Sequence, residues 1–423
     1  MKDVLALVLA GGRVDELSVL TLPRPKSAVP FGGMYRVIDF PLSNLMHSGV
    51  ERVGILSQYR SFSLINHVGV GAWWDFVGRD RGATMLLPSK GHQVSDWYKG
   101  TADAVYQNLE FVREQGAGTV LVLSGDHVYK MDYAPMLAYH REKDADVTVA
   151  FAPIEPQASS RFGVGELDDE DGETGGRVVR YLEKPRDAQL GLASLTIYLF
   201  KPQVLYRVLE ANAGKESHEF GRDIIANMVG SHRVYGYRFT GYWGYSRTID
   251  EYWQCNMNLL DEHPAIRLEE WQVRTNLDHD RLRDRPPARV GSAAQVENSL
   301  IHNGCLVDGE VSNSILFPGV RVEKGAVVRD SILFFDSVVR QGAVLKKVIT
   351  DFEVEVGAGC VLGEGEDIPN RQTPELLSSG ITLLGKGVHL PAGTCLGKNV
   401  IVHPGLTGER FAREQFESGL TIT

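Results

Sequence analysis

Cysteine is scarce in this sequence, and its spacing excludes two classes of protein. The 423 residues contain four cysteines, at positions 255, 305, 360 and 395, and no two of them form a Cys-x-x-Cys pair. Disulfide-rich secreted domains and small zinc modules need more cysteines at closer spacing. We therefore expect a fold built on a hydrophobic core, and a location in the reducing cytoplasm.

Long apolar runs and an excess of positive charge are also missing. No run approaches the roughly 18 apolar residues that a membrane span needs. The apolar stretch 1–12 is short, carries an acidic residue and ends in two glycines, which predicts a buried strand and not a signal peptide. The net charge is -10, and an acidic surface repels nucleic acid and anionic lipid. We expect neither nucleic acid nor a membrane as a partner.

Length and composition predict two soluble domains. A chain of 423 residues is too long for one ordinary core, and its hydrophobic fraction of 43% and charged fraction of 23% are typical of globular proteins. A change of texture near residue 291 gives the boundaries that we predict. They are a first domain at 1–260, a charged and proline-rich linker at 261–290 and a second domain at 291–423.

The first domain alternates short apolar runs with helical segments. Runs of this length that end at glycine are typical of buried parallel strands, and strands alternating with helices indicate a Rossmann-like sheet with right-handed crossovers. The predicted strands are 4–10, 52–57, 119–124 and 145–152, and 38–49 is a predicted helix. In such sheets the ligand lies at the carboxyl ends of the strands. Gly11 and Gly12 follow one strand, and Gly125 and Asp126 follow another.

The second domain repeats aliphatic residues with a period near six, punctuated by glycine. This period predicts a parallel β-helix with three short strands per coil, whereas an antiparallel sandwich would show turns at a spacing of 8–12 residues. The segment 364–380 is a predicted loop off the coil. The aliphatic residues expected to point inward include Val296, Ile301, Leu306, Val311, Ile315, Val320, Val322, Val327 and Ile332.

A glycine loop and a lysine near the N-terminus suggest a phosphate site. The stretch 9–13 reads LAGGR, and 23–33 reads PRPKSAVPFGG. Glycines let backbone N–H groups approach an anion, and basic side chains neutralise it. A Gly-Gly pair alone is weak evidence. Followed by AVPFGGMYRVIDFPLSN, it closely resembles the ADP-glucose pyrophosphorylase (glucose-1-phosphate adenylyltransferase) family.

Further segments resemble this family in the same order, and the likeness covers nearly the whole chain. They are 97–104 (WYKGTADA), 123–130 (LSGDHVYK), 162–164, 183–185, 193–194, 219–223 and 248–253. The resemblance implies a mixed parallel sheet of the nucleotide-diphospho-sugar transferase type, followed by a left-handed parallel β-helix. The implied reaction joins ATP and α-glucose 1-phosphate into ADP-glucose and pyrophosphate, with Mg²⁺ as cofactor.

The resemblance also assigns roles to single residues. Asp126 would hold Mg²⁺ and orient the α-phosphate, and Lys26 would meet the triphosphate. On the sugar side, Lys184 would bind the phosphate of glucose 1-phosphate and Glu183 would accept hydrogen bonds from sugar hydroxyls. Tyr98 would lie near the substrate. The remaining expected site residues are Gly163 and Ser194 around the sugar phosphate and Gly11, Gly12, Gly100 and Thr101 around the nucleotide.

Several positions depart from the family pattern. Val14 stands where the pattern has glycine, and β-branched side chains resist a positive φ. Glu16 stands where the pattern has arginine, which places negative charge near the expected triphosphate. Tyr245 stands where the family has a second metal-binding aspartate, and a phenol with a pKa near ~10 is no substitute at neutral pH. Asp250 is close in sequence but would need a shifted backbone to replace it.

Two more departures concern the base and the activator. Only Gln93, out of register, is available where the family offers glutamine to adenine. Pro23 stands where some bacterial members carry a lysine for a sugar-phosphate activator, which leaves the activator open.

Three readings of the function follow. The first is a working adenylyltransferase, the second a regulatory subunit that binds sugar phosphate and modulates a catalytic paralogue, and the third a transferase for another nucleotide or sugar. A β-helix acyltransferase is disfavoured because the N-terminal motifs are specific. The expected assembly is a homotetramer, or a hetero-oligomer with a paralogue under the second reading.

Overall fold

The computed structural model describes residues 1–423 except 13, 89–96, 169, 187–189 and 412–414. The chain forms two compact units, and each is built from two stretches of sequence. Unit 1 contains 1–12 and 38–243, and unit 2 contains 13–37 and 244–423. The N-terminal segment that carries Lys26 therefore belongs to the same unit as the C-terminal β-strands.

Unit 1 is a nine-stranded mixed sheet. Its strand order is β5-β4-β1-β6-β11-β8-β12-β10-β9. Four neighbouring strands are parallel: β5 (Gly82–Leu86), β4 (Arg52–Leu56), β1 (Val4–Leu9) and β6 (Thr119–Ser124). The long strand β11 (Leu192–Phe200) runs antiparallel to β6 and to β8 (Val147–Pro153). The four apolar runs of the sequence are thus confirmed as strands.

The other edge of this sheet is antiparallel. Strand β12 (Val234–Arg238) runs parallel to β8, and β10 (Gly175–Glu183) pairs antiparallel with both β12 and β9 (Gly163–Leu167). A short strand, β7 (Val128–Tyr129), follows β6. The resulting sheet is the mixed α/β sheet that the sequence predicts, with ligand-motif residues on both its parallel and its antiparallel part.

Helices supply the apolar cover of the sheet in unit 1. Side chains of β1 and β6, such as Leu7 and Val122, form a continuous buried cluster with Val105, Val112 and Leu209 from three helices. The amphipathic spacing of these helices places their apolar faces against the sheet. The helices of unit 1 are α1 (Asp39–His47), α2 (Phe62–Val68), α3 (Thr101–Tyr106), α4 (Leu109–Glu114), α5 (Ala134–Glu142), α6 (Pro202–Asn212) and α7 (Ala226–Met228).

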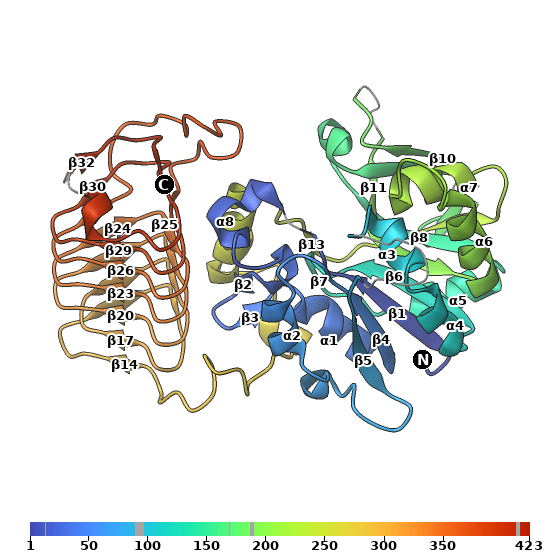
Figure 1. Cartoon of the computed structure of the whole chain (residues 1–423), viewed down its shortest axis with the longest axis horizontal. Coiled ribbons are helices and arrows are strands. Elements are labelled where there is room, and N and C mark those ends of the chain that lie inside the picture. The colour runs from blue at the N-terminus through green and yellow to red at the C-terminus, as the bar shows by residue number, and fades with distance from the viewer. Residues whose placement is uncertain (13, 89–96, 169, 187–189, 412–414) are drawn as a thin grey trace. The chain divides into compact units, whose positions relative to one another are not determined.

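The C-terminal part of unit 2 is a left-handed parallel β-helix, drawn in orange and red in Figure 1. Three parallel ladders of short strands form its faces. In the second ladder Val327 lies opposite Val344 and Val344 lies opposite Val361, so one coil takes 17 residues and each face about six. The period near six is therefore confirmed, and the segment 364–380 contains no strand.

The strands of the three ladders have the following bounds. The first contains β14 (Arg289–Val290), β17 (Leu306–Val307), β20 (Arg321–Val322), β23 (Val338–Val339), β26 (Glu355–Val356) and β29 (His389–Leu390). The second contains β15 (Gln295–Glu297), β18 (Glu310–Ser312), β21 (Val327–Arg329), β24 (Val344–Lys346), β27 (Val361–Leu362), β30 (Cys395–Leu396) and β32 (Gln415–Phe416). The third contains β16 (Leu300–Ile301), β19 (Ile315–Leu316), β22 (Ile332–Leu333), β25 (Val348–Thr350), β28 (Thr382–Leu384), β31 (Ile401–Val402) and β33 (Thr421–Ile422).

Not all of the residues expected to point inward do so. Val327 is half-buried, while its neighbour Val328 lies in the β-helix core. Leu306 is 38% exposed, while its neighbour Val307 is 1% exposed and lies in the β-helix core. Side chains alternate along a strand, so one of two adjacent aliphatic residues must face outward. Val296 is 41% exposed on β15, the end strand of its ladder. Val311, Val320 and Val322 are buried as expected.

The rest of unit 2 is a short helical layer and a hairpin. A 3-10 segment at Asp15–Thr21 and another at Lys26–Ala28 precede the strands β2 (Pro30–Phe31) and β3 (Tyr35–Arg36). Helices α8 (Ile249–Met257) and α9 (Leu268–Trp271) follow β13 (Trp243–Gly244). The boundaries at 260 and 290 remain a prediction. Among the described residues, every helix is too short or too polar to cross a lipid bilayer.

Candidate nucleotide and sugar-phosphate site

Three strand ends meet at the carboxyl edge of the parallel sheet in unit 1. Gly11 follows β1, Gln58 follows β4 and Asp126 follows β6, and these three strands are neighbours. A Cβ on Gly11 would lie 3.0 Å from the backbone nitrogen of Gln58, so only glycine fits without displacement there. A Cβ on Gly12 would meet nothing within 4 Å, so this residue borders open space. The arrangement is the usual ligand edge of a parallel α/β sheet.

Asp126 is a partly exposed carboxylate at this edge. Its side chain is 27% exposed, accepts a hydrogen bond from the Ser124 hydroxyl and lies 3.4 Å from Nε2 of His127. The His127 ring packs edge-on against Trp243, with centroids 5.4 Å apart. These contacts fix the direction of the carboxylate while leaving part of it open. A partly open carboxylate fits Mg²⁺, which takes one or two carboxylates, substrate phosphates and water.

Glu183 lies in a tight cradle formed by two glycines. A Cβ on Gly163 would lie 2.7 Å from Oε2 of Glu183, and a Cβ on Gly221 would lie 3.0 Å from its carboxyl carbon. The Tyr181 hydroxyl donates to the same Oε2 over 3.4 Å. Burial raises the pKa of Glu183 above its ordinary value, against the opposing effects of Lys184 and Tyr181. Three sequence motifs, 162–164, 183–185 and 219–223, thus converge on one carboxylate.

Lys184 and Ser194 flank this cradle. Lys184 is exposed and has a φ of 48°, a conformation that costs a non-glycine residue about 1–3 kcal/mol. Its backbone N–H donates to the Phe162 carbonyl over 2.9 Å. The Ser194 hydroxyl is buried beside Tyr198, and within the described residues it makes no hydrogen bond of normal geometry. Backbone strain and an unsatisfied buried hydroxyl are typical of ligand sites.

Tyr98 is packed into the core of unit 1. It is 8% exposed, and its hydroxyl donates to the Leu86 carbonyl over 3.2 Å and accepts from Asn108 over 3.1 Å. Burial raises its pKa. The Gln58 side chain accepts from the Tyr98 backbone N–H over 2.7 Å. Its packing gives Tyr98 a structural role, and its closeness to substrate stays a prediction. Sequence reasoning missed Gln58, although its place just after a buried strand was a usable signal.

Gly100 and Thr101 join two distant motifs. A Cβ on Gly100 would lie 3.1 Å from Oε1 of Glu219 and closer still to the His218 carbonyl. The Thr101 hydroxyl donates to Oε2 of Glu219 over 2.7 Å and accepts from the Phe220 N–H over 3.0 Å. The Thr101 hydroxyl is therefore committed to protein contacts that hold 219–223 in place. The predicted nucleotide contact of these residues is untested.

Lys26 and the altered positions lie together in unit 2. Lys26 is 2% exposed, and its ammonium faces the Tyr245 ring at 5.3 Å from the centroid. The Glu16 carboxylate accepts from Nε of Arg247 over 2.7 Å, and Nη1 of Arg247 lies 3.4 Å from the Tyr245 hydroxyl. Burial alone would lower the pKa of Arg247, but Tyr245 and Glu16 raise it above its ordinary value. The negative charge of Glu16 is thus matched by a cation that sequence reasoning did not single out.

The other departures are also accommodated. Val14 has a φ of -120°, which a valine adopts without strain, so the expected conflict does not arise. The Asp250 carboxylate accepts from the Ser379 hydroxyl and is occupied by the loop that leaves the β-helix. This contact engages Asp250 within unit 2. The glutamine proposed for the base, Gln93, lies outside the described residues.

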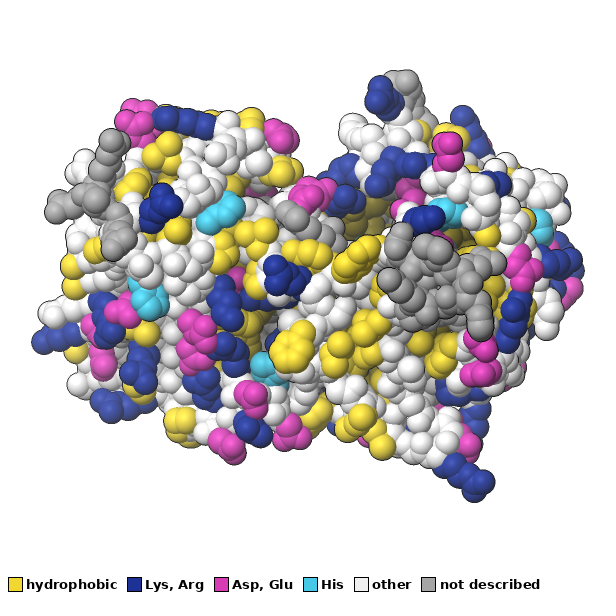
Figure 2. Space-filling model, in the orientation of Figure 1, with side chains coloured by type: hydrophobic (Ala, Val, Ile, Leu, Met, Phe, Trp, Pro, Cys, Tyr) yellow, Lys and Arg dark blue, Asp and Glu magenta, His cyan; other side chains and the backbone are white. Residues whose placement is uncertain are grey.

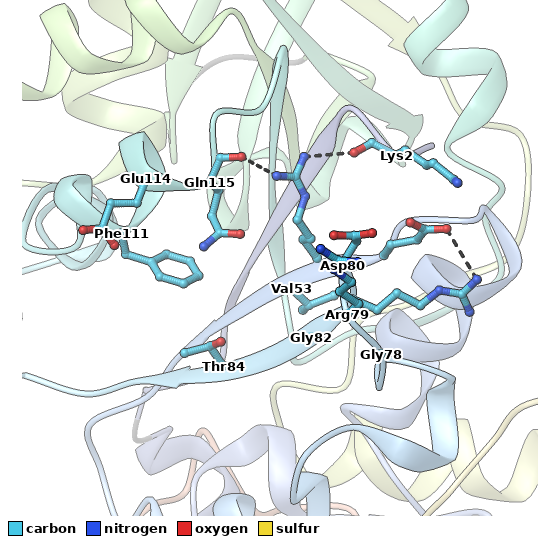
Figure 3. A pocket seen from close by; sticks show the side chains of 13 residues that line it. Lys2, Val53, Gly78, Arg79, Asp80, Gly82, Thr84, Phe111, Glu114 and Gln115 are labelled. Carbon is cyan, nitrogen blue, oxygen red and sulfur yellow. Dashed lines mark hydrogen bonds and ion pairs between the residues drawn. The ribbon is translucent and has the colours of Figure 1, made fainter.

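A second hollow in unit 1 lies at the opposite edge of the sheet. This cavity of about 770 Å³ borders the amino ends of β1, β4 and β5. Figure 3 shows residues that line it, among them Lys2, Arg79 and Gln115. Two of its arginines are engaged with neighbours: Arg52 donates to the backbone carbonyls of Gln115 and Lys2, and Arg81 lies 3.6 Å from Glu51. Ligands of parallel sheets bind at the other, carboxyl, edge, so this cavity is separate from the strand-end site.

The exposed coils of the β-helix carry mixed charge. Arg340 reaches Glu323 and Glu355 on the coils to either side, at 2.8 Å each. Figure 2 shows basic and acidic side chains intermingled on the β-helix face in view. Mixed charge at this density does not make a basic track for a polyanion.

Comparison with known proteins agrees with this architecture. Residues 5–262 match the family described as Nucleotidyl transferase, and residues 286–384 match the family described as GlmU-like, C-terminal hexapeptide. The fold and the strand-end site therefore define a nucleotidyltransferase with a hexapeptide β-helix.

Similar proteins cover the whole chain. A glucose-1-phosphate adenylyltransferase of Thermotoga neapolitana is 46% identical over 99% of this chain and 98% of its own length. Proteins of the same name from Thermomicrobium roseum and Acetivibrio thermocellus are 44% and 38% identical, each over 100% of this chain and 98% of its own length. The chain belongs to the glucose-1-phosphate adenylyltransferase family. Because these relatives carry the name of the catalytic activity, the reading as a regulatory subunit is not favoured.

Proposed function

We propose that the protein transfers the adenylyl group of ATP to α-glucose 1-phosphate, giving ADP-glucose and pyrophosphate for glycogen or α-glucan synthesis. The identity of 46% over 99% of the chain with a relative of that name carries this proposal. The convergence of three motifs on Glu183 also supports it, because a half-buried carboxylate between glycines suits a polyhydroxylated ligand.

The residues divide the chemistry between them. A phosphate oxygen of glucose 1-phosphate attacks the α-phosphorus of ATP, and the bond from that phosphorus to the bridging oxygen of pyrophosphate breaks. Lys184 binds the sugar phosphate, and Glu183 accepts hydrogen bonds from the sugar. Lys26 binds the triphosphate. Enzymes of this kind gain rate mainly by positioning the reactants and neutralising charge.

A divalent metal is general for nucleotidyltransferases of this type. We propose Mg²⁺, held by Asp126 together with substrate oxygens. Within the described part of the chain, no group of three His, Cys, Asp or Glu side chains is arranged to hold a metal, so substrate would supply much of the coordination. When bound, the metal neutralises charge that develops on the phosphates.

The decisive experiment is pyrophosphate release by the purified protein with ATP, glucose 1-phosphate and Mg²⁺. Asp126→Ala should abolish turnover. Asp280→Ala is the matched control, because this carboxylate is 84% exposed and its one ion pair among the described residues is with Arg283, three residues away. Turnover that survives in Asp126→Ala, or is missing from the unmodified protein, would contradict the proposal.

We also propose a homotetramer, since the exposed coils and ends of a β-helix favour assembly. Light scattering on the purified protein would test it. A mass of four chains is the expected result, and a monomer, or activity only in the presence of a paralogue, would refute it.

A further inference from the structure

Arg247 contacts two of the altered positions, Glu16 and Tyr245. Its backbone is fixed, because its N–H donates to Oε2 of Glu251 over 3.0 Å at the capping box that starts α8. Its side chain extends to Glu16 through Nε and to Tyr245 through Nη1. Within the described residues its second amino group, Nη2, makes no hydrogen bond. A guanidinium whose second amino group is not hydrogen-bonded can donate to an oxyanion.

Tyr245 brings Arg247 near Lys26. The hydroxyl end of the phenol contacts Arg247, and the ring face contacts the Lys26 ammonium. One uncharged ring thus lies between two cations. The side chains of Arg247 and Glu16 are 38% and 28% exposed, so both can be reached from solvent. Lys26 itself is buried, at 2% exposed. Two cations on one aromatic side chain, one of them part-exposed, suit a polyanion better than a metal or an uncharged group.

We propose that Arg247 binds the polyphosphate of the nucleotide together with Lys26, and that Glu16 holds Arg247 in place until the phosphate displaces it. The inference rests on the proposed function and assigns a phosphate-binding role to a residue at which the sequence showed no sign of one. Glu16 then acts as a competitor for the guanidinium, not as a source of repulsion. Breaking the Glu16–Arg247 pair costs little free energy, since a part-exposed ion pair stabilises by only about 0–1 kcal/mol.

Two substitutions by uncharged glutamine, Arg247→Gln and Glu16→Gln, should change the affinity for ATP in opposite directions and so test this assignment. Calorimetric titration with ATP and Mg²⁺, without sugar phosphate, measures nucleotide binding in the absence of turnover. Arg247→Gln should weaken ATP binding by roughly tenfold to a hundredfold, because it removes charge-assisted bonds to phosphate. Glu16→Gln should tighten ATP binding by about twofold to fivefold, because it frees the guanidinium. The double variant should behave like Arg247→Gln.

Three controls keep the test specific. Arg329→Gln breaks a similar exposed pair with Glu310 (2.6 Å) on the β-helix and should leave ATP binding unchanged. Titration with glucose 1-phosphate should give the same affinity in every variant, which separates the triphosphate from other phosphates. If Arg247→Gln fails to fold, Arg247→Lys keeps the charge and should retain part of the affinity.

The outcomes separate the inference from the proposed function. If both single variants weaken ATP binding alike, the ion pair only fixes the segment 15–21 and the assignment of Arg247 is wrong. If the unmodified protein makes ADP-glucose and Arg247→Gln binds ATP normally, the assignment fails while the function stands. If the unmodified protein neither binds ATP nor forms ADP-glucose, both fail.

Discussion

The cradle around Glu183 makes a sharp prediction for Gly163→Ala. The new Cβ would lie 2.7 Å from Oε2 of Glu183 and closer still to the Tyr181 hydroxyl that donates to this oxygen, whereas ordinary contact begins at 3.4 Å, so Oε2 must move away by about 0.7 Å and the hydroxyl by more. The carboxylate has little room to yield, because Gly221 borders the same group. A displacement of this size breaks hydrogen bonds to the sugar. A hydrogen bond to a charged group is worth about 1.5–3 kcal/mol, so kcat/KM for glucose 1-phosphate should fall roughly tenfold to a hundredfold.

Steady-state kinetics with each substrate varied in turn would check this. The loss should fall on glucose 1-phosphate and leave the KM for ATP unchanged. Gly214→Ala is the matched control, since Gly214 is exposed and a Cβ there would meet nothing within 4 Å. Unchanged kinetics for glucose 1-phosphate in Gly163→Ala, with thermal unfolding also unchanged, would show that Glu183 does not orient the sugar phosphate.

Three more predictions follow from single contacts. Asp126→Asn should lower pyrophosphate release by at least roughly a hundredfold without changing the thermal midpoint, because the side chain is 27% exposed. Because the pKa of Glu183 is raised above the ordinary 4.5, its carboxylate takes up a proton at a higher pH than a free glutamate does. The acid limb of the pH profile of kcat/KM for glucose 1-phosphate should therefore lie above pH 4.5, and it should disappear in Glu183→Gln. Asp351→Asn should lower the free energy of unfolding in urea by about 3–5 kcal/mol, because it leaves Arg24, only 2% exposed and 2.8 Å away, without its countercharge. If Asp351→Asn lost less stability than the double variant Arg24→Met, Asp351→Leu, this reasoning would be contradicted.

The fold was largely readable because its signals are periodic and local. The apolar runs gave the strands of unit 1, and the period near six gave the β-helix. The wrong predictions concern which of two adjacent residues faces the core. In a two-residue strand such as β17, one aliphatic residue faces in and the other out, so the pattern Leu306-Val307 fits either choice. The antiparallel insertion of β11 between β6 and β8 depends on pairings distant in sequence, and no local pattern encodes it.

Candidate site residues could be proposed from the sequence where a residue follows a buried strand or belongs to a recognised motif. Asp126 and Gly11 each follow a buried strand. Glu183 belongs to a recognised motif, and in the fold two glycines border its carboxylate. The partnership of Thr101 with Glu219 spans 118 residues and was invisible to any spacing argument. Gln58, whose side chain accepts from the Tyr98 N–H, follows a buried strand but belongs to no recognised motif.

The altered positions 16 and 245 show most clearly that contacts between residues distant in sequence cannot be predicted from spacing. Taken one at a time, Glu16 is a charge reversal and Tyr245 a lost carboxylate, and each argues against catalysis. Taken together they share Arg247, which neutralises the first and bonds to the second. Glu16 and Arg247 are 231 residues apart in sequence, so the compensation exists only in the folded chain. A sequence comparison that scores positions independently therefore counts the charge of Glu16 as unbalanced, although the folded chain pairs it with Arg247.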